Sequence, residues 1–131
     1  MDILFEKVAV KPGRPTVFGK KQNRFVFGLP GNPVSSFIIF ELIAKPFIYR
    51  LMGHDYKPVR LQVPVGVDYS RKKADRIAWT PVKLENGTAI PVDYHGSAHI
   101  HSLCFSQGLM AMGVGISEYK KGELVDVRFF Q

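Results

Sequence analysis

Residues 26–36 read VFGLPGNPVSS, an apolar, strand-like run that passes through two glycines and two prolines into a helix start. Asn32 is a residue type preferred at a helix N-cap, and Pro33 is typical of the first helical position. The pattern predicts that the three backbone amides after Pro33 remain free. Free amides at the positive end of a helix dipole bind phosphate and other oxyanions, and the hydroxyls of Ser35 and Ser36 could add donors.

The charge pattern around this helix start also points to an anion. The net charge is +7, and residues 1–58 carry nine basic against four acidic residues, whereas residues 59–131 carry nine against seven. No acidic residue occurs between residues 7 and 40, where the basic residues are Lys7, Lys11, Arg14, Lys20, Lys21 and Arg24. A basic patch beside a helix start predicts an anionic ligand. The alternative is a solvated surface that keeps the protein soluble.

The elements that must position this turn can be placed from the sequence. We expect a strand near residues 5–10, a basic loop over 11–23, a strand over 24–29 and a long helix from residue 33 to about residue 51. Gly53 is the expected stop of that helix.

The predicted helix is apolar almost all round, so it must be covered on more than one side. Pro46 should kink it, because proline removes one backbone hydrogen bond and crowds the carbonyl of Leu42. Two strands and one such helix in so few residues cannot bury the helix among themselves. Either a partner covers it or the chain is part of a longer protein.

The second half is predicted to be all-β, with short alternating segments between turn residues. Asn86-Gly87 is the strongest hairpin signal of the chain. Residues 97–103 resemble one or two helical turns with Ser97 as N-cap. Short strands with one small helix suit a compact barrel or sandwich. The expected strands are 60–67, 77–84, 88–94, 109–114 and 124–130, and the prolines at 64, 81 and 91 place several of them at edges or bulges.

Other chemistry has weak support. His95, His99 and His101 lie close together, yet only Asp93 could join them, so surface or hydrogen-bonding histidines are favoured over a metal site. Cys104, the single cysteine, has apolar neighbours and is interpreted as a packed core thiol. One cysteine forbids an internal disulfide and fits a reducing compartment. Motifs of ATPases, dinucleotide-binding proteins and nucleophile-elbow hydrolases are absent.

Composition favours a globular protein of the cytoplasm. Hydrophobic residues make up 46% of the 131 positions, enough for a core. The longest uninterrupted apolar runs have only four residues, as in residues 37–40. Such runs are too short for a membrane span, and we expect neither a signal peptide nor membrane binding.

Two motifs together resemble a known family. The sequence KPGRP at residues 11–15, followed by GLPGNPVSS at residues 28–36, closely resembles the signature of the MoeA family. This family comprises the molybdopterin molybdenumtransferases and includes the E domain of gephyrin. The resemblance continues in order along the chain, through Pro46, Gly53, Gly96-Ser97 and the GELV sequence of residues 122–125.

The resemblance implies an α+β chain of two parts. Residues 1–56 would be the end of a molybdopterin-binding α/β domain, with a strand-loop-strand-helix order, and residues 57–131 a C-terminal β-barrel domain. The implied reaction uses Mg²⁺ and inserts molybdenum from molybdate into adenylylated molybdopterin with release of AMP. Family members are considerably longer and typically homodimeric. Their magnesium-binding carboxylates lie upstream of the matched region, so no metal ligands are expected here, and the chain alone is expected to be inactive.

The resemblance also implies roles for single residues. Lys11 matches the first lysine of the family's K-P-G-K loop, at the active site, and Arg14 replaces the second lysine with a planar cation of different geometry. Four residues match the anion-binding turn: Gly31, Asn32, Pro33 and Ser35. Ser97 matches a serine of the substrate cleft. A family arginine falls on Pro81, so either Arg76 supplies that charge or the site is altered.

Two other classes of function compete with the enzyme. A small basic β-barrel could bind nucleic acid, but the positive charge clusters outside the expected barrel and no ladder of stacking aromatic residues is evident. A scaffold role is the second alternative, because gephyrin's E domain also clusters receptors. The sequence does not separate a scaffold from an enzyme that binds a small anionic substrate.

Overall fold

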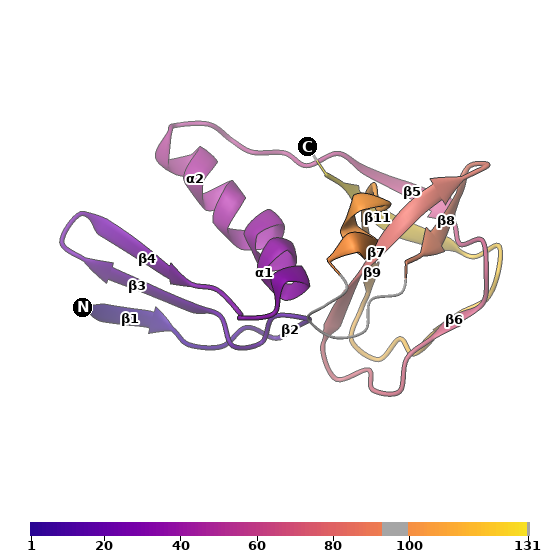
Figure 1. Cartoon of the computed structure of the whole chain (residues 1–131), viewed down its shortest axis with the longest axis horizontal. Helices are drawn as coiled ribbons and strands as arrows, with labels where there is room; N and C mark the ends of the chain where they lie inside the picture. The colour runs from indigo at the N-terminus through magenta and orange to yellow at the C-terminus, as the bar shows by residue number, and fades with distance from the viewer. Residues whose placement is uncertain (93–99, 131) are drawn as a thin grey trace. The chain divides into compact units, whose positions relative to one another are not determined.

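The computed structural model describes residues 1–92 and 100–130. The chain divides into two units, residues 1–56 and residues 57–131, which we call the first and the second unit (Figure 1). Within the described residues, no helix has both the length and the apolar character needed to cross a membrane.

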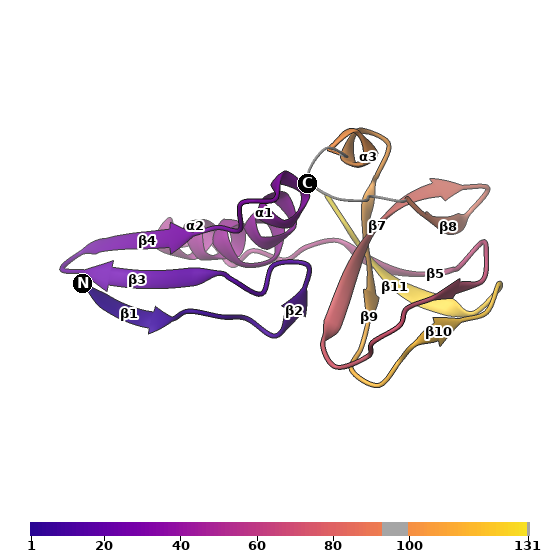
Figure 2. The same cartoon turned by 60° about the horizontal axis from the view of Figure 1, so that its bottom comes forward.

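The first unit contains an antiparallel sheet in which β3 (Val17–Lys21) lies between β1 (Asp2–Phe5) and β4 (Arg24–Gly28). Figure 2 shows the three strands side by side. β3 and β4 form a hairpin in which Lys21 pairs with Arg24. A further short strand, β2 (Val10–Lys11), follows β1. The expected strand at 24–29 is confirmed as β4.

Two expectations for this region are wrong. The strand lies at residues 2–5 and not at 5–10, because the edge of β3 that accepts it pairs with Asp2, Ile3 and Phe5. The expected basic loop over 11–23 contains β3, in which Phe18 is buried while Lys20 and Lys21 are exposed. Exposed lysines at the end of a strand do not disturb its backbone pairing. The strand was missed because its charged residues were interpreted as part of a loop.

The expected long helix is present but is not a regular α-helix. It consists of α1 (Pro33–Ile39), a π-helical turn η1 (Phe40–Ala44) and α2 (Lys45–Leu51). The amide of Lys45 donates to the carbonyl of Phe40, five residues back. The π turn directly precedes Pro46, whose ring would clash with the carbonyl of Leu42 in a regular helix. The distortion predicted from Pro46 therefore takes the form of a π turn.

Figure 1 shows the helix on one face of the sheet. Aromatic rings join the two. Phe47 of α2 lies with its ring centroid 5.2 Å from that of Phe18, 5.0 Å from Phe25 and 5.5 Å from Phe27. Phe5 adds a fifth ring, 5.6 Å from Phe18. Rings at these separations and tilts interact favourably beyond the area that they bury. This aromatic cluster joins the helix to the sheet, with Phe18 buried at its centre and Phe25 still 37% exposed.

Much apolar surface in the first unit stays exposed, as the sequence predicted for a helix with too few neighbours. Leu51 is 58% exposed and Ile48 43% exposed on α2. On the sheet, Ile3 and Val26 are each nearly half exposed, and both pair with Gly19 across β3.

In the second unit, β7 (Ile77–Glu85), β9 (Gly108–Met112), β11 (Leu124–Phe129) and β5 (Arg60–Pro64) pair antiparallel in that order. β8 (Thr88–Pro91) pairs with β7. All five expected strands are thereby present, with ends that differ by a few residues. Residues 93 and 94, expected in the third of them, lie outside the described residues.

Smaller elements complete the second unit. Asn86 and Gly87 join β7 to β8 with φ values of 50° and 74°, which confirms the predicted hairpin. β6 (Tyr69–Ser70) and β10 (Glu118–Tyr119) form a separate two-stranded sheet that the sequence did not predict. α3 (His101–Cys104) lies at the end of the helix expected at 97–103, of which residues 97–99 fall outside the described residues.

The β-barrel expected for residues 57–131 is not found as a closed barrel among the described residues. The strand-pairing path runs from β8 to β5, and its two ends meet only through one isolated bridge between Val65 and Ala89. A single bridge does not close a barrel by strand pairing. Two of the three strands with prolines lie at edges, as expected, because β5 with Pro64 and β8 with Pro91 end the path. β7, which contains Pro81, instead has β9 on one side and, from Val82 onward, β8 on the other. Pro64 and Pro91 lie at strand ends, where a missing amide is tolerated.

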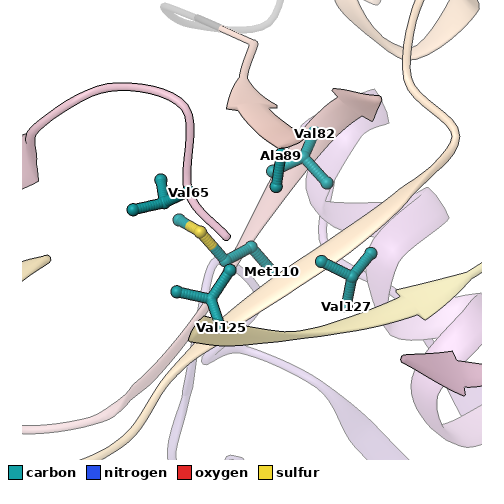
Figure 3. Packing of buried hydrophobic residues seen from close by; sticks show 6 residues of the cluster. All are labelled: Val65, Val82, Ala89, Met110, Val125 and Val127. Carbon is teal, nitrogen blue, oxygen red and sulfur yellow. The ribbon is translucent and has the colours of Figure 1, made fainter. Parts of the chain in front are cut away.

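The core of the second unit is aliphatic, and Figure 3 shows its buried side chains directed toward one another. Its members come from β7, β8, β9, β11 and the segment after β5, and all are at most 2% exposed: Val65, Val82, Ala89, Met110, Val125 and Val127. Because successive side chains of a strand point to opposite faces, the residues between these core positions face the opposite side of the sheet.

Candidate functional site

The loop of residues 11–15 is held in a defined shape by its backbone. Gly13 has a φ of 115°, a conformation that residues with a side chain rarely adopt. The carbonyl of Arg14 accepts hydrogen bonds from the amides of Val8 and Thr16, both at 2.9 Å. The Lys11–Pro12 peptide bond is cis. The side chains of Lys11 and Arg14 are exposed, so a rigid loop presents two cations to solvent.

Thr16 is the residue in this region that the sequence reasoning missed. Its side chain is fully buried, and its hydroxyl donates to the carbonyl of Gly13 at 2.6 Å. A threonine bonded to the carbonyl three residues earlier fixes the turn between them. The signal was available in the sequence as a hydroxyl residue three positions after a glycine.

The helix start has the predicted cap but not the predicted free amides. Asn32 is the N-cap, with an extended backbone, and Pro33 is the first helical residue. The Oδ1 atom of Asn32 accepts from the amides of Val34 at 3.0 Å and Ser35 at 3.4 Å. The amide of Ser36 donates to the carbonyl of Asn32 at 2.9 Å. The expectation of three free amides is therefore wrong, because the cap side chain and the first helical bond take them.

The loop and the helix start lie close together. A Cβ atom on Gly13 would overlap the side chain of Ile39, so the loop backbone sits directly on α1. Ser35 lies one turn before Ile39 and shares its face of the helix. Both are buried, Ser35 to 8% exposure and Ile39 fully. The loop that carries Lys11 thus covers the face of α1 to which Ser35 belongs.

This arrangement can attract an anion by charge and dipole. The amides are occupied, but the helix dipole keeps its positive end at Asn32. Gly31 is exposed, and nothing lies within 4 Å of the position where a Cβ would stand, so a ligand can approach its backbone. With Lys11 and Arg14 at the adjacent loop, cationic side chains rather than free amides are the groups available to bind an oxyanion.

The remaining candidates do not join this cluster in the described residues. Ser97, Asp93, His95 and His99 lie outside them, while His101 is exposed on α3. Among the described residues, no three histidine, cysteine or acidic side chains come together as a metal site. Cys104 is exposed, so its interpretation as a core thiol is wrong. Its neighbour Phe105 is 69% exposed as well, so apolar neighbours in the sequence did not indicate a buried side chain here.

Replacing Asn32 with alanine should lower the free energy of unfolding of the first unit by about 1 kcal/mol, because two amides lose their acceptor. Chemical denaturation followed by far-UV circular dichroism measures this change. Asn23→Ala, in the exposed turn between β3 and β4, is the matched control and should change the stability little. Equal losses in the two variants would contradict the capping role.

Comparisons with known proteins identify the class of this fold. A family model described as a probable molybdopterin binding domain matches residues 1–50, and one described as the MoeA C-terminal region (domain IV) matches residues 62–130. The crystal structure of the molybdopterin biosynthesis MoeA protein from Pyrococcus horikoshii superimposes on 98% of this chain with a TM-score of 0.85 and 28% identity. A molybdenum cofactor biosynthesis protein from Pyrococcus furiosus gives a TM-score of 0.83 and 26% identity over 98% of the chain.

The chain belongs to the MoeA family. The molybdopterin molybdenumtransferase of Staphylococcus epidermidis is 29% identical over 129 residues, which are 95% of this chain and 31% of that relative. The enzyme of the same name from Haemophilus influenzae is 49% identical over 49 residues, 37% of this chain and 12% of that protein. The chain also covers 32% of the P. horikoshii structure. It therefore spans about a third of the length of the S. epidermidis and P. horikoshii relatives and 45% of the P. furiosus chain.

Proposed function

We propose that this chain supplies part of a molybdenum-insertion site in molybdenum cofactor biosynthesis. The observation that carries the proposal is the rigid loop of Lys11 and Arg14 packed on the face of α1 that holds Ser35. The matched family models and relatives support the same reaction class. The substrates in this proposal are molybdate and adenylylated molybdopterin, and AMP is released.

In this proposal Lys11 and Arg14 neutralise the negative charge of molybdate and of the substrate phosphate. Two anions that must meet repel each other, and fixed cations beside a helix start lower that repulsion in the transition state. Gly31, Asn32, Pro33 and Ser35 form the wall against which the anionic group rests. Ser97, which matches a serine of the family's substrate cleft, lies outside the described residues and is kept in the proposal from that resemblance alone.

The described residues do not fit a magnesium site. Mg²⁺ prefers carboxylate oxygens, and no acidic residue occurs between residues 7 and 40, around the loop and helix start. The described residues also hold no cluster of three candidate ligands. If the reaction uses Mg²⁺, its ligands come from outside the described residues, so we derive no step through the metal. The proposal extends to a homodimeric assembly in the cytoplasm, as the resemblance implies.

Exchange of a segment in a related enzyme tests the proposal. The matching segment of the S. epidermidis molybdopterin molybdenumtransferase is replaced with this chain, and molybdate-dependent formation of the cofactor is measured in a strain that lacks its own enzyme. We expect the exchanged protein to restore cofactor formation, while this chain expressed alone does not. An exchanged protein that is soluble and shows native-like circular dichroism, yet restores nothing, would contradict the proposal.

A further inference from the structure

Thr16 is the most deeply buried polar residue of the first unit. It has no exposed surface, whereas Ser35 and Glu41, the other buried polar residues of this unit, keep 8% and 7%. Burying a hydroxyl costs free energy unless it is hydrogen-bonded, and valine has nearly the same shape without that cost. The hydroxyl therefore does something that a methyl group at the same place could not do.

Thr16 binds both carbonyls that flank the Cα atom of Arg14. Its hydroxyl donates to the carbonyl of Gly13 at 2.6 Å, and its amide donates to the carbonyl of Arg14 at 2.9 Å. The amide of Val8 donates to the same Arg14 carbonyl, also at 2.9 Å. Each carbonyl belongs to a planar peptide group, so holding the two carbonyls holds the peptide planes on both sides of Arg14.

These two planes set the direction in which the Arg14 side chain leaves the loop. A residue has only two soft backbone torsions, and both are fixed once the neighbouring peptide planes are held. The Cβ atom of Arg14 then has one direction. The loop also rests on α1 at Gly13, where a Cβ atom would overlap Ile39, so this direction is fixed relative to the helix start as well.

Direction matters more for an arginine than for a lysine. A guanidinium group is planar and binds an oxyanion best through two parallel N–H bonds, whereas an ammonium group is a compact charge with three donors that rotate. Arg14 is exposed, so its side chain is free to turn beyond Cβ. Holding its base reduces the number of orientations that are given up when an anion binds.

We propose that Thr16 is a positioning residue for the oxyanion and acts through Arg14. The hydroxyl is fully buried and does not touch the anion. It holds the base of Arg14 in the direction from which the guanidinium group meets molybdate or a substrate phosphate. The inference rests on the proposed function for the identity of the anion. The hold of Thr16 on the loop does not depend on that function and is measured separately.

Amide hydrogen exchange in the 131-residue chain measures this hold. Thr16→Val removes the hydroxyl and keeps the shape, whereas Thr16→Ser keeps the hydroxyl and removes a methyl group. The amides of residues 8 and 16 donate to the Arg14 carbonyl. After correction for intrinsic rates, we expect both to exchange at least about tenfold faster in Thr16→Val than in Thr16→Ser, because the turn opens locally.

The amides of β3 are the internal reference for this measurement, because a global loss of stability would accelerate their exchange too. Equal exchange of residues 8 and 16 in the two variants would overturn the inference. So would an acceleration in Thr16→Val that is as large in β3 as in the loop.

Molybdate binding is measured by isothermal titration calorimetry in the exchanged S. epidermidis enzyme. Thr16→Val should weaken the affinity by about three- to tenfold, the range for ordering one flexible side chain, and Thr16→Ser by less than about twofold. Both variants lose stability, so a purely structural role would not separate them. Thr88→Val is the matched control, because the Thr88 hydroxyl donates to the carbonyl of Glu85, three residues earlier, at 2.8 Å. It should leave the affinity unchanged.

A double-mutant cycle shows whether Thr16 acts through Arg14. In an Arg14→Gln background, Thr16→Val should change the molybdate affinity by less than about twofold, because no guanidinium group is left to direct. An equal effect of Thr16→Val in both backgrounds would overturn the inference. Affinity lost in Arg14→Gln but kept in Thr16→Val would overturn the inference alone, whereas unchanged affinity in Arg14→Gln would also remove Arg14 from the proposed function.

Discussion

Replacing Gly13 with alanine should lower the free energy of unfolding of the first unit by about 3 kcal/mol, the combined effect of backbone strain and overpacking. The φ of 115° is unfavourable for any residue with a side chain. The new methyl group would also overlap Cγ1 and Cδ1 of Ile39, which is fully buried and cannot move aside freely. Chemical denaturation followed by far-UV circular dichroism measures the loss.

Two further variants distinguish strain from overlap. Gly53→Ala is the matched control, because Gly53 has a φ of 82° and nothing lies within 4 Å of the place its new Cβ would take, so only strain is added. It should lose about 1 kcal/mol. In an Ile39→Ala background, Gly13→Ala should cost less than in the natural chain, since the overlapping atoms are gone. Additive losses of Gly13→Ala and Ile39→Ala would show that the loop does not rest on α1 as described.

The second large effect is expected at Lys11. In the exchanged S. epidermidis enzyme, Lys11→Ala should weaken molybdate binding by about 10- to 100-fold, the range for loss of one charge-assisted hydrogen bond. Isothermal titration calorimetry with molybdate measures the affinity. Because the Lys11 side chain is exposed, the variant should unfold at an unchanged denaturant concentration.

Lys7→Ala provides the control for Lys11. Lys7 is exposed and lies in the same acid-free stretch, but outside the loop that rests on α1. Its removal subtracts one charge from the surrounding field and should change the molybdate affinity less than about threefold, as for a screened surface charge. Lys11→Arg should retain part of the binding, since the charge stays while the geometry changes. Unchanged affinity in Lys11→Ala would remove Lys11 from the proposed site.

Local sequence signals predicted the structure correctly where a residue type occurs at a position for a single structural reason. Asn86-Gly87 predicted the correct hairpin because both positions need a positive φ. Asn32-Pro33 predicted the correct helix start because an amide side chain caps the helix and proline needs no amide partner there. The family resemblance, carried by the same turn and by the loop of residues 11–15, was confirmed by the matched family models.

The errors arose where the outcome depends on contacts that are distant in sequence or on competition for the same atom. The position of β1 is set by the edge of β3, which a search for local alternation does not see. The helix-start amides were assumed free, yet the residue that marks the helix start also consumes two of them.

The π turn of residues 40–44 changes which side chains share a face of the helix. In a regular α-helix each residue advances by about 100°, so Phe47 would lie about 80° away from Ile39 around the axis. A π turn accommodates one additional residue, which takes back about one such step and brings Phe47 to within about 20° of Ile39. This shift aligns the side of α1 that the loop of residues 11–15 covers with the side of α2 from which Phe47 reaches the rings of Phe18 and Phe25. A helical wheel drawn for an unbroken helix therefore spreads the apolar residues over the whole circumference. In the structure, the π turn keeps Ile39 and Phe47 on one side of the helix.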